Sequence, residues 1–346
     1  MLYIPFLSNF ARRIFPSSIM VRKYTSTYII ILASLFCIFA GCTSGNNDVV
    51  PEPIIRLDSL ALKSRNGAQT ILPKDIKSCA DALIQYLGQT HGDTTWQAYA
   101  SSRAVAAFAP EAAKAFPNLA PLRDTLGMIL HNAAVSGLVL PHRHYASVVW
   151  SDRKSIVINE PYVFVALNHY LGSEHPAYSG WPQYIRATKK PQMLPYDLAE
   201  ALIAEAYPYD SLAIARRTVL SRLLYEGALA YAKTQVVPEA SEALALGYNE
   251  ATMADIHSNE AFIWRHLIEG QMLYSTDATL MEKLFDPAPQ TYIISPDAPG
   301  RVVRYIGLQI VTSFLKKYPE TSLVQLLSPS FFGAKNSLEK AGYAPA

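Results

Sequence analysis

The chain has 346 residues, half of them hydrophobic and 17% charged, with a formal net charge of only +2. Its basic residues are dispersed, so neither the charge nor its distribution indicates a nucleic-acid-binding protein. Beyond residue 53, roughly 300 residues remain, which is enough to bury a large core as one large domain or two small ones.

The N-terminal segment has the pattern of a bacterial lipoprotein signal. An apolar run, residues 28–40, follows Arg22 and Lys23 and ends in the sequence FAGC. The run is too short to span a bilayer comfortably, and a small-residue pair directly before Cys42 is typical of a lipobox. The alternative is an ordinary secretory signal followed by a chance cysteine. We predict a signal peptide over residues 1–41 and a lipid on Cys42 after cleavage.

The segment before Met20 makes this signal unusually long, so we expect the true start at Met20. Residues 42–53 are polar and then punctuated by proline, which predicts a flexible tether behind the lipid. Of the three cysteines, Cys37 leaves with the signal and Cys42 is lipidated. Cys79 is therefore left alone, and its apolar neighbours at helical spacing predict a buried structural thiol.

Helical periodicity dominates the rest of the chain. Proline and glycine delimit a first helix over residues 73–88, and an alanine-rich segment, 95–116, is expected to break near Pro110. Between residues 145 and 158 the period changes, and two short strands around a polar turn predict a β-hairpin. Further helices are predicted over residues 120–138, 161–172, 195–207, 211–234, 250–272 and 300–318. The expected fold is mainly α with a small β-hairpin or sheet, as a single domain over residues 54–346.

The histidines form no recognisable metal motif. His169 and His175, in VFVALNHYLGSEHPAYSGWPQYIR, are six residues apart, which is about 600° of helical rotation and places them on different faces. His142 and His144 would share a strand face, but no clear acidic third ligand is near them in the sequence. The sequence predicts no metal and no cofactor.

Templates for catalysis do not fit either. The sequence has no G-x-S-x-G nucleophile elbow, no phosphate-binding glycine loop and no dinucleotide-binding fingerprint. Glu200 and Glu205 lie roughly 140° apart on a helical wheel, which suits a solvated helix face better than the carboxylate pair of a glycosidase. We predict no catalytic residue.

Five blocks of sequence occur in order between Ile54 and Leu327, behind the lipid signal: IIRLDSL, VFVALNHYLGSEHPAYSGWPQYIR, IWRHLIEGQMLYSTD, FDPAPQT and APGRVVRYIGLQIVTSFLKKYP. Together they resemble the gliding-motility lipoprotein GldB family. The motif residues carried over from the resemblance are Asn168, Tyr170, Gly172, Tyr184, Trp264, Arg265, Glu269, Gly300 and Arg301. Asn168 is a departure, because the family often has an aspartate there, and a charged role is not carried over.

The resemblance implies a periplasm-facing lipoprotein of the cell envelope, tied to gliding motility and the associated type IX secretion apparatus. The inner leaflet of the outer membrane is a more expected location than the inner membrane. The implied partners are the membrane, through the lipid on Cys42, and protein components of the gliding or secretion machinery. No catalytic activity comes with the resemblance, and on this interpretation His169 and His175 are incidental.

The family is also distantly similar to zinc peptidases of the gluzincin type, in which a zinc-binding helix precedes a helix that carries a glutamate ligand. This similarity implies a degenerate zincin-like α+β fold, with Glu226 in LLYEGALAY as a vestigial ligand. The preceding helix, 195–207, has no histidine, so three ligands cannot assemble in the zincin manner. A buried unpaired carboxylate is costly, and we expect Glu226 to pair with Arg222, Arg301 or Arg304.

Three functions remain open from the sequence. The first is a non-catalytic lipoprotein that supports an envelope machine. The second is a zinc-dependent peptidase-like hydrolase with unrecognised ligands, which tightly bound zinc would favour. The third is a protein that binds envelope lipid or glycan fragments, which a large pocket would favour.

Overall fold

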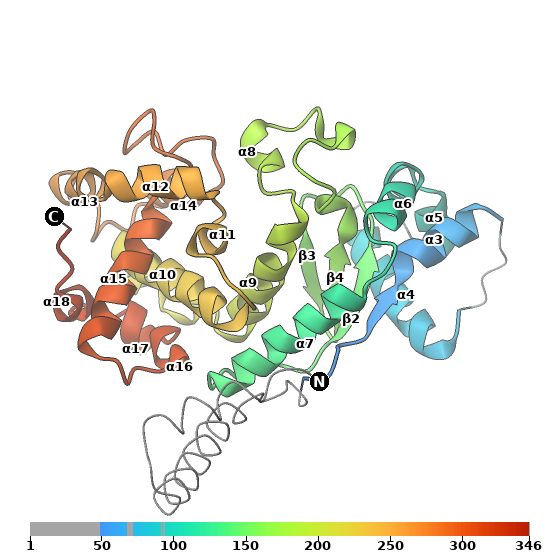
Figure 1. Cartoon of the computed structure of the whole chain (residues 1–346), viewed down its shortest axis with the longest axis horizontal. Coiled ribbons are helices and arrows are strands. Elements are labelled where there is room, and N and C mark those ends of the chain that lie inside the picture. The colour runs from blue at the N-terminus through green and yellow to red at the C-terminus, as the bar shows by residue number, and fades with distance from the viewer. Residues whose placement is uncertain (1–48, 68–71, 91, 93, 346) are drawn as a thin grey trace, which may run out of the picture. The chain divides into compact units, whose positions relative to one another are not determined.

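The structure, a computed structural model, describes residues 49–67, 72–90, 92 and 94–345 (Figure 1). The predicted signal peptide, the start at Met20 and the lipid-attachment site Cys42 lie outside the described residues. Val49–Ala346 forms one compact unit by its internal contacts. The fold is mainly α-helical with one small mixed sheet, as the sequence predicted.

The elements of the sheet and of the helices around it come first in the chain. They are β1 (Ile54–Arg56), α3 (Leu57–Arg65), α4 (Lys74–Thr90), α5 (Trp96–Ser101), α6 (Arg103–Ala115), α7 (Ala120–Val135), β2 (His144–Val148), β3 (Ile156–Asn159) and β4 (Tyr162–Ala166). The C-terminal half is helical. Its helices are α8 (Gln183–Arg186), α9 (Leu194–Ala206), α10 (Val219–Val236), α11 (Glu242–Leu246), α12 (Glu250–Ser258), α13 (Glu260–Glu269), α14 (Ala278–Phe285), α15 (Val303–Lys317), α16 (Leu323–Leu326), α17 (Pro329–Phe332) and α18 (Ser337–Ala341).

The sheet has the strand order β1-β2-β4-β3. β1 and β2 are parallel, as are β2 and β4, and only β3 runs antiparallel to its neighbour β4. The predicted strand segments are present, but the predicted hairpin is wrong, because β4 lies between them. The helix predicted over residues 161–172 is also wrong, since its first half is this strand. Its residues YVFVA are buried almost throughout, and a short apolar run shows no periodicity that separates a buried strand from a buried helix.

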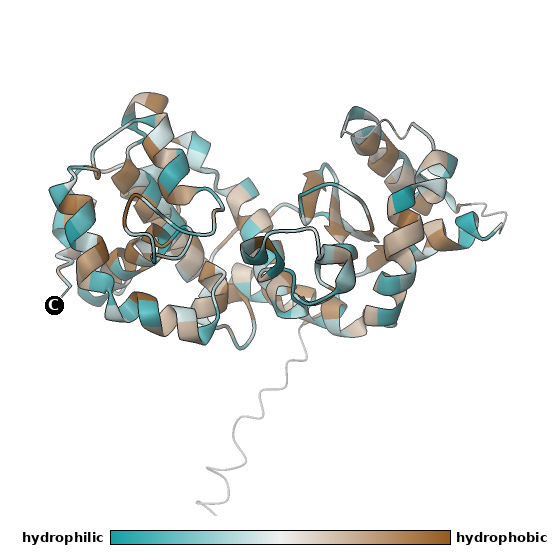
Figure 2. Cartoon of the chain, turned by 90° about the horizontal axis from the view of Figure 1, so that it is seen from above, coloured by the Kyte–Doolittle hydropathy of each residue, from teal (hydrophilic) through white to brown (hydrophobic). Residues whose placement is uncertain are grey.

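Two apolar cores lie on either side of α9. The first joins the sheet to α3, α4, α5 and α6, and includes Cys79, whose side chain is fully buried, as predicted. Burial raises the pKa of this thiol to about 12, so it is protonated and unreactive. Figure 2 shows the strands as a hydrophobic patch within this part of the chain. The second core is built around α10, most of whose side chains are buried.

Two helix starts are set by capping side chains that the sequence-based predictions did not include. The predicted break near Pro110 is wrong: Pro110 lies inside α6, and the break occurs at Ser102. The Ser102 hydroxyl accepts a hydrogen bond from the backbone N–H of Val105 at 3.2 Å, which starts α6. Likewise, the helix predicted over 211–234 begins only at Val219, after the capping box formed by Thr218 and Ser221.

Helices α10 and α15 cross at two glycines. A Cβ atom on Gly227 would lie 2.2 Å from the backbone carbonyl of Gly307, and one on Gly307 would lie 2.1 Å from the carbonyl oxygen of Leu223. Only glycine at both positions allows the two backbones to touch. The crossing brings the first turns of α15 against the middle of α10, where Glu226 precedes Gly227.

Candidate functional site

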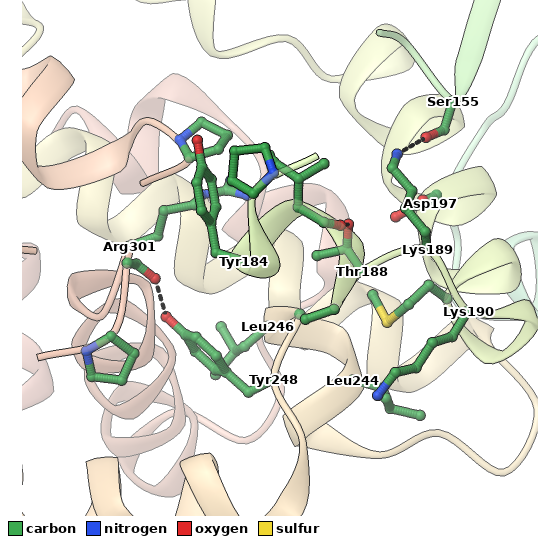
Figure 3. A pocket seen from close by; sticks show the side chains of 18 of the residues that line it. Ser155, Tyr184, Thr188, Lys189, Lys190, Asp197, Leu244, Leu246, Tyr248 and Arg301 are labelled. Atoms are coloured by element: carbon green, nitrogen blue, oxygen red, sulfur yellow. Dashed lines mark hydrogen bonds between the residues drawn. The ribbon is translucent and has the colours of Figure 1, made fainter. Parts of the chain in front are cut away.

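A cleft of about 910 Å³ opens beside this crossing (Figure 3). Its lining comes from six stretches of the chain: residues 151–155, 180–193, Asp197 and Glu200 on α9, Lys233 on α10, residues 244–252, and residues 287–304. Such distant stretches meet only in the folded chain. The volume is in the range of pockets that bind small molecules or short segments of a partner.

An ion network forms one wall of the cleft. Glu226, whose side chain is 3% exposed, lies 2.6 Å from Arg222 (Oε1 to Nη2) and 2.8 Å from Arg304 (Oε2 to Nε). The Arg304 guanidinium also donates to Glu200 Oε2 at 3.3 Å, and Lys233 pairs with the same carboxylate oxygen. The network therefore ties α9, α10 and α15 together through alternating charges.

The charges in this network keep one another ionised. Burial alone would raise the pKa of Glu226, but Arg304 and Arg222 outweigh burial and hold that pKa below its ordinary value. Lys233 and Arg304 do the same for the pKa of Glu200. Burial acts to lower the pKa of Arg304, and Glu200 and Glu226 reverse this effect and raise it. Glu226 is thus a carboxylate with an arginine beside each oxygen, although its Oε2 accepts no hydrogen bond.

A second polar group lies behind the opposite wall. Lys189 Nζ donates to Ser155 Oγ at 2.8 Å and lies 3.5 Å from His169 Nδ1, which is 3.0 Å from the same hydroxyl. Burial, and next the charge of Lys189, lower the pKa of His169 to about 3, so this imidazole is neutral. Close by, the Tyr170 hydroxyl donates to Asp197 Oδ2 at 2.8 Å, and burial raises the pKa of Asp197 to about 6.

Arg301 is held differently from Arg304. It makes no ion pair with any residue that the structure describes, whereas Arg304 makes two. The Nε atoms of both arginines are buried without a hydrogen bond. Its φ of +65° is a left-handed conformation that costs a non-glycine residue energy and that clusters at functional sites. Burial, and next the positive charge of Arg304, lower the pKa of Arg301.

The loop before Arg301 is pinned to the body of the protein. The Tyr248 hydroxyl donates to the carbonyl oxygen of Gly300 at 2.8 Å, and the Thr291 hydroxyl donates to that of Pro299 at 2.8 Å. A Cβ atom on Gly300 would lie 1.8 Å from the carbonyl oxygen of Ala288, so only glycine fits there. The unpaired guanidinium is therefore carried by a fixed loop.

Comparison with known families identifies the chain. A family model described as gliding motility protein GldB matches residues 48–345. The chain belongs to the GldB family of gliding motility proteins. Membership implies involvement in gliding motility, with a location and protein partners in the cell envelope. Searches of curated proteins and of solved structures found no match, and no comparison supports the similarity to zinc peptidases.

The remaining motif residues of this GldB-family chain are spread over the fold. Tyr184, Gly300 and Arg301 lie in the cleft, whereas Arg265 and Glu269 are exposed on α13. Trp264, beside them, is half-buried and meets the edge of Tyr343 with ring centroids 5.0 Å apart. Gly172, with φ of +108°, occupies a turn that favours glycine. The structure therefore brings only part of the motif set together.

Asn168 has a structural role that an ionised aspartate could not fill in the same way. Its Oδ1 accepts from the backbone N–H of Trp150 at 3.1 Å, and its Nδ2 donates to the carbonyl oxygen of the same residue at 2.8 Å. Both groups are buried. An ionised carboxylate can only accept, so it would leave the Trp150 carbonyl unpaired. The amide fits this position, whereas a buried charge would not.

Two residues in or beside the cleft, Glu200 and His169, carried no signal in the sequence. Glu200 was expected on a solvated helix face, but it pairs with Lys233 and Arg304. His169 was expected to be incidental, but it is fully buried against Ser155 and Lys189. Burying a cation requires an anion or a hydroxyl beside it. This requirement is the one signal that could have linked the buried cations to Glu200 and Ser155.

The other histidines lie away from the cleft. The rings of His142 and His144 are 5.3 Å apart and both residues are exposed, while His175 Nε2 lies 3.2 Å from Glu111. In the part of the chain that the structure describes, no three His, Cys, Asp or Glu side chains come together in a way that could hold a metal ion. Over the same residues, no helix is both long and apolar enough to cross a membrane.

Proposed function

We propose that this chain is a non-catalytic, periplasm-facing lipoprotein that supports the gliding machinery and its associated type IX secretion apparatus. The observation that carries the non-catalytic part is the state of Glu226. A general base or a metal ligand needs a carboxylate oxygen free to take a proton or a metal ion. Each oxygen of Glu226 instead forms an ion pair, Oε1 with Arg222 and Oε2 with Arg304. This favours a supporting role over the zinc-peptidase alternative.

The anchor in this proposal is a lipid on Cys42. Residues 42–53 serve as the tether, and the domain over residues 54–346 is held at the membrane surface on the periplasmic side. We favour the inner leaflet of the outer membrane over the inner membrane, as the family resemblance implies. Only Asp48 supplies an acidic residue within several positions of the cysteine, so we see no acidic tract that would direct the protein to the outer surface of the cell.

Crosslinking in living cells tests the proposal. The full chain carrying an affinity tag is crosslinked, purified and analysed by mass spectrometry, with a Cys42→Ala variant as the matched control. We expect gliding or type IX secretion components to co-purify with the wild-type chain and to be depleted from the variant. Recovery of the uncrosslinked monomer alone from gliding cells would contradict a supporting role.

The zinc-peptidase alternative is tested on the purified protein. We expect no stoichiometric zinc by metal analysis and no change in melting temperature on adding zinc or a chelator. A zinc-dependent rise in melting temperature that disappears in Glu226→Gln would overturn the non-catalytic proposal and restore the enzyme.

Ligand binding is a second candidate function, and the cleft of about 910 Å³ favours it. Pockets of this size with a few polar groups are the usual sites of ligand recognition. The candidate is compatible with a supporting role, because a protein that holds a machine together must recognise its components.

A further inference from the structure

The cleft has an excess of positive charge. Its lining contains two carboxylates, Asp197 and Glu200, and six cationic side chains. The cationic residues are Arg153, Lys189, Lys190, Lys233, Arg301 and Arg304. Clefts lined mainly by one sign of charge concentrate ligands of the opposite sign, because their walls exclude water and focus the field. The expected ligand is therefore anionic.

The cations that line the cleft differ in whether the protein itself neutralises them. Arg304 and Lys233 are neutralised within the protein by Glu226 and Glu200. Arg301 and Lys190 form no ion pair with any described residue. Figure 3 shows Arg301 beside Tyr184 and Tyr248, well apart from Lys190 near the start of α9. Arg153 and Lys189 form no ion pair with a described residue either, but Arg153 is exposed and Lys189 donates to Ser155. Arg301 and Lys190 are therefore the two cations that we consider for a ligand, and they come from different walls.

Arg301 has the features of a prepared anchor. Its backbone is held at φ of +65° behind the pinned Gly300, and its buried Nε has no partner. A buried donor without a partner costs free energy, and a left-handed arginine adds to that cost. A carboxylate accepted by this guanidinium would satisfy the donor through charge-assisted hydrogen bonds.

Aromatic and proline side chains surround these cations. Trp181 and Tyr184 line one side of the cleft, and Tyr248, Pro289 and Pro299 line another. Rigid apolar surfaces of this kind pack against the aliphatic parts of a peptide, whereas a phosphate group stays hydrated. We propose that the cleft binds an acidic peptide segment of a partner protein, with one carboxylate on Arg301 and a second on Lys190.

The arrangement disfavours a phosphate headgroup as the ligand. Asp197 and Glu200 face the same cleft, and they would repel a multiply charged phosphate more strongly than a single carboxylate. Arg301 and Lys190 also lie apart, which suits two separate carboxylates along an extended segment. The inference rests on the proposed function, since it names the chemistry by which a supporting protein would recognise its partner.

Fluorescence anisotropy with the full chain in detergent tests this proposal. The probe is a labelled peptide of alternating glutamate and leucine, and its matched control replaces each glutamate by glutamine. Competitors are inorganic phosphate and vesicles of anionic phospholipid. We expect the acidic probe alone to bind, with an affinity that falls as salt is added, because the attraction is electrostatic.

Variants then locate the site. Arg301→Gln should weaken binding by about ten- to a hundredfold, as expected for a lost hydrogen bond to a charged group. Arg301→Lys should keep only part of the wild-type affinity for the acidic probe, since an ammonium cannot bind a carboxylate through two parallel hydrogen bonds. Lys190→Gln should weaken binding too, and it remains informative if Arg301→Gln fails to fold. Arg103→Gln, which removes an exposed arginine outside the cleft, is the matched control and should leave binding unchanged.

Three results would overturn the inference: equal binding of the glutamine probe, displacement of the acidic probe by phosphate or vesicles, or unchanged binding in both Arg301→Gln and Lys190→Gln. If one of these occurs while envelope partners are still crosslinked in cells, only the cleft assignment fails and the supporting role stands. If crosslinking to partners is lost as well, both proposals fail.

Discussion

Replacing Arg304 by methionine should be the most destabilising single change in the ion network. Its side chain is 2% exposed and lies between two carboxylates, at 2.8 Å from Glu226 and 3.3 Å from Glu200. Methionine has a similar length but no charge, so Glu226 would keep only Arg222, which is one-third exposed. Breaking a buried ion pair by removing one partner costs about 3–5 kcal/mol of unfolding free energy.

Replacing Glu226 by glutamine should cost less, about 1.5–3 kcal/mol, which is typical of a hydrogen bond to a charged group. Glutamine keeps the shape of the side chain, Arg304 retains Glu200, and Arg222 can turn to water. The double variant Glu226→Gln/Arg304→Met should lose less than the sum of the single losses. We expect a coupling of about 1–3 kcal/mol, because each single change already breaks the shared contact.

Urea denaturation followed by circular dichroism measures these values, provided that the denaturant slope is unchanged. Lys77→Met is the control, since its ion pair with Asp81 is exposed on both sides and should contribute less than about 1 kcal/mol. An Arg304→Met loss no larger than that of the control would refute the reasoning, as would strictly additive losses in the double variant.

The pH dependence gives the same network a second test. The pKa of Glu226 is lower in the folded chain than its ordinary value, so its ion pairs contribute stability above that ordinary value. This contribution is lost as the pH falls through the folded pKa. The stability gap between the wild-type chain and Glu226→Gln should therefore narrow in acid. A gap that widened as the pH fell would contradict the assignment.

Three further predictions concern other parts of the chain. Gly307→Ala should cost about 1–3 kcal/mol, because its Cβ would lie 2.1 Å from the Leu223 carbonyl oxygen, whereas Gly180→Ala, in open space, should leave the urea midpoint unchanged. The wild-type chain should lose stability by up to about 1.4 kcal/mol per pH unit below pH 6.5, because His169 binds a proton in the unfolded chain but not in the folded one, where its pKa is lowered to about 3. In urea melts across the acid range, His169→Gln should reduce this dependence of stability on pH. Cys42→Ala should abolish metabolic fatty-acid labelling and move the protein out of the membrane fraction, and continued labelling would contradict lipidation at this cysteine.

The predictability of the fold differed between helices and strands. The helix over residues 73–88 was predicted closely because a proline before its start and a long amphipathic repeat agree with α4. Its predicted end at Gly88 is two residues short, because this glycine lies inside the helix. β4 was missed because four of its five residues are buried and it runs parallel to β2, so no alternation of polar and apolar residues marks it. Register and strand order are set by contacts between distant segments, which local periodicity does not contain.

The candidate site was also predictable only in part. Pairing of Glu226 with an arginine was predicted from the cost of an isolated buried charge, and the structure places Arg222 and Arg304 at its two oxygens. Which arginine would stay unpaired could not be predicted, because Arg301 and Arg304 are only three residues apart. Their difference arises from the left-handed backbone at Arg301 and the helix crossing beside Arg304.

The difference between Arg301 and Arg304 also gives the two arginines different roles in one cleft: Arg304 stabilises the fold, and Arg301 is available to a ligand. The paired Arg304 joins α9, α10 and α15, so the walls are fixed before any ligand arrives, and binding carries little cost for ordering them. Arg301, carried by a loop that Tyr248 holds in place, adds no ion pair to this frame. Loss of the Arg301 guanidinium should therefore affect a ligand far more than the fold, while loss of the Arg304 guanidinium should weaken the fold first and the ligand as a consequence. Two arginines of the same cleft thus distinguish a binding site from a purely structural network.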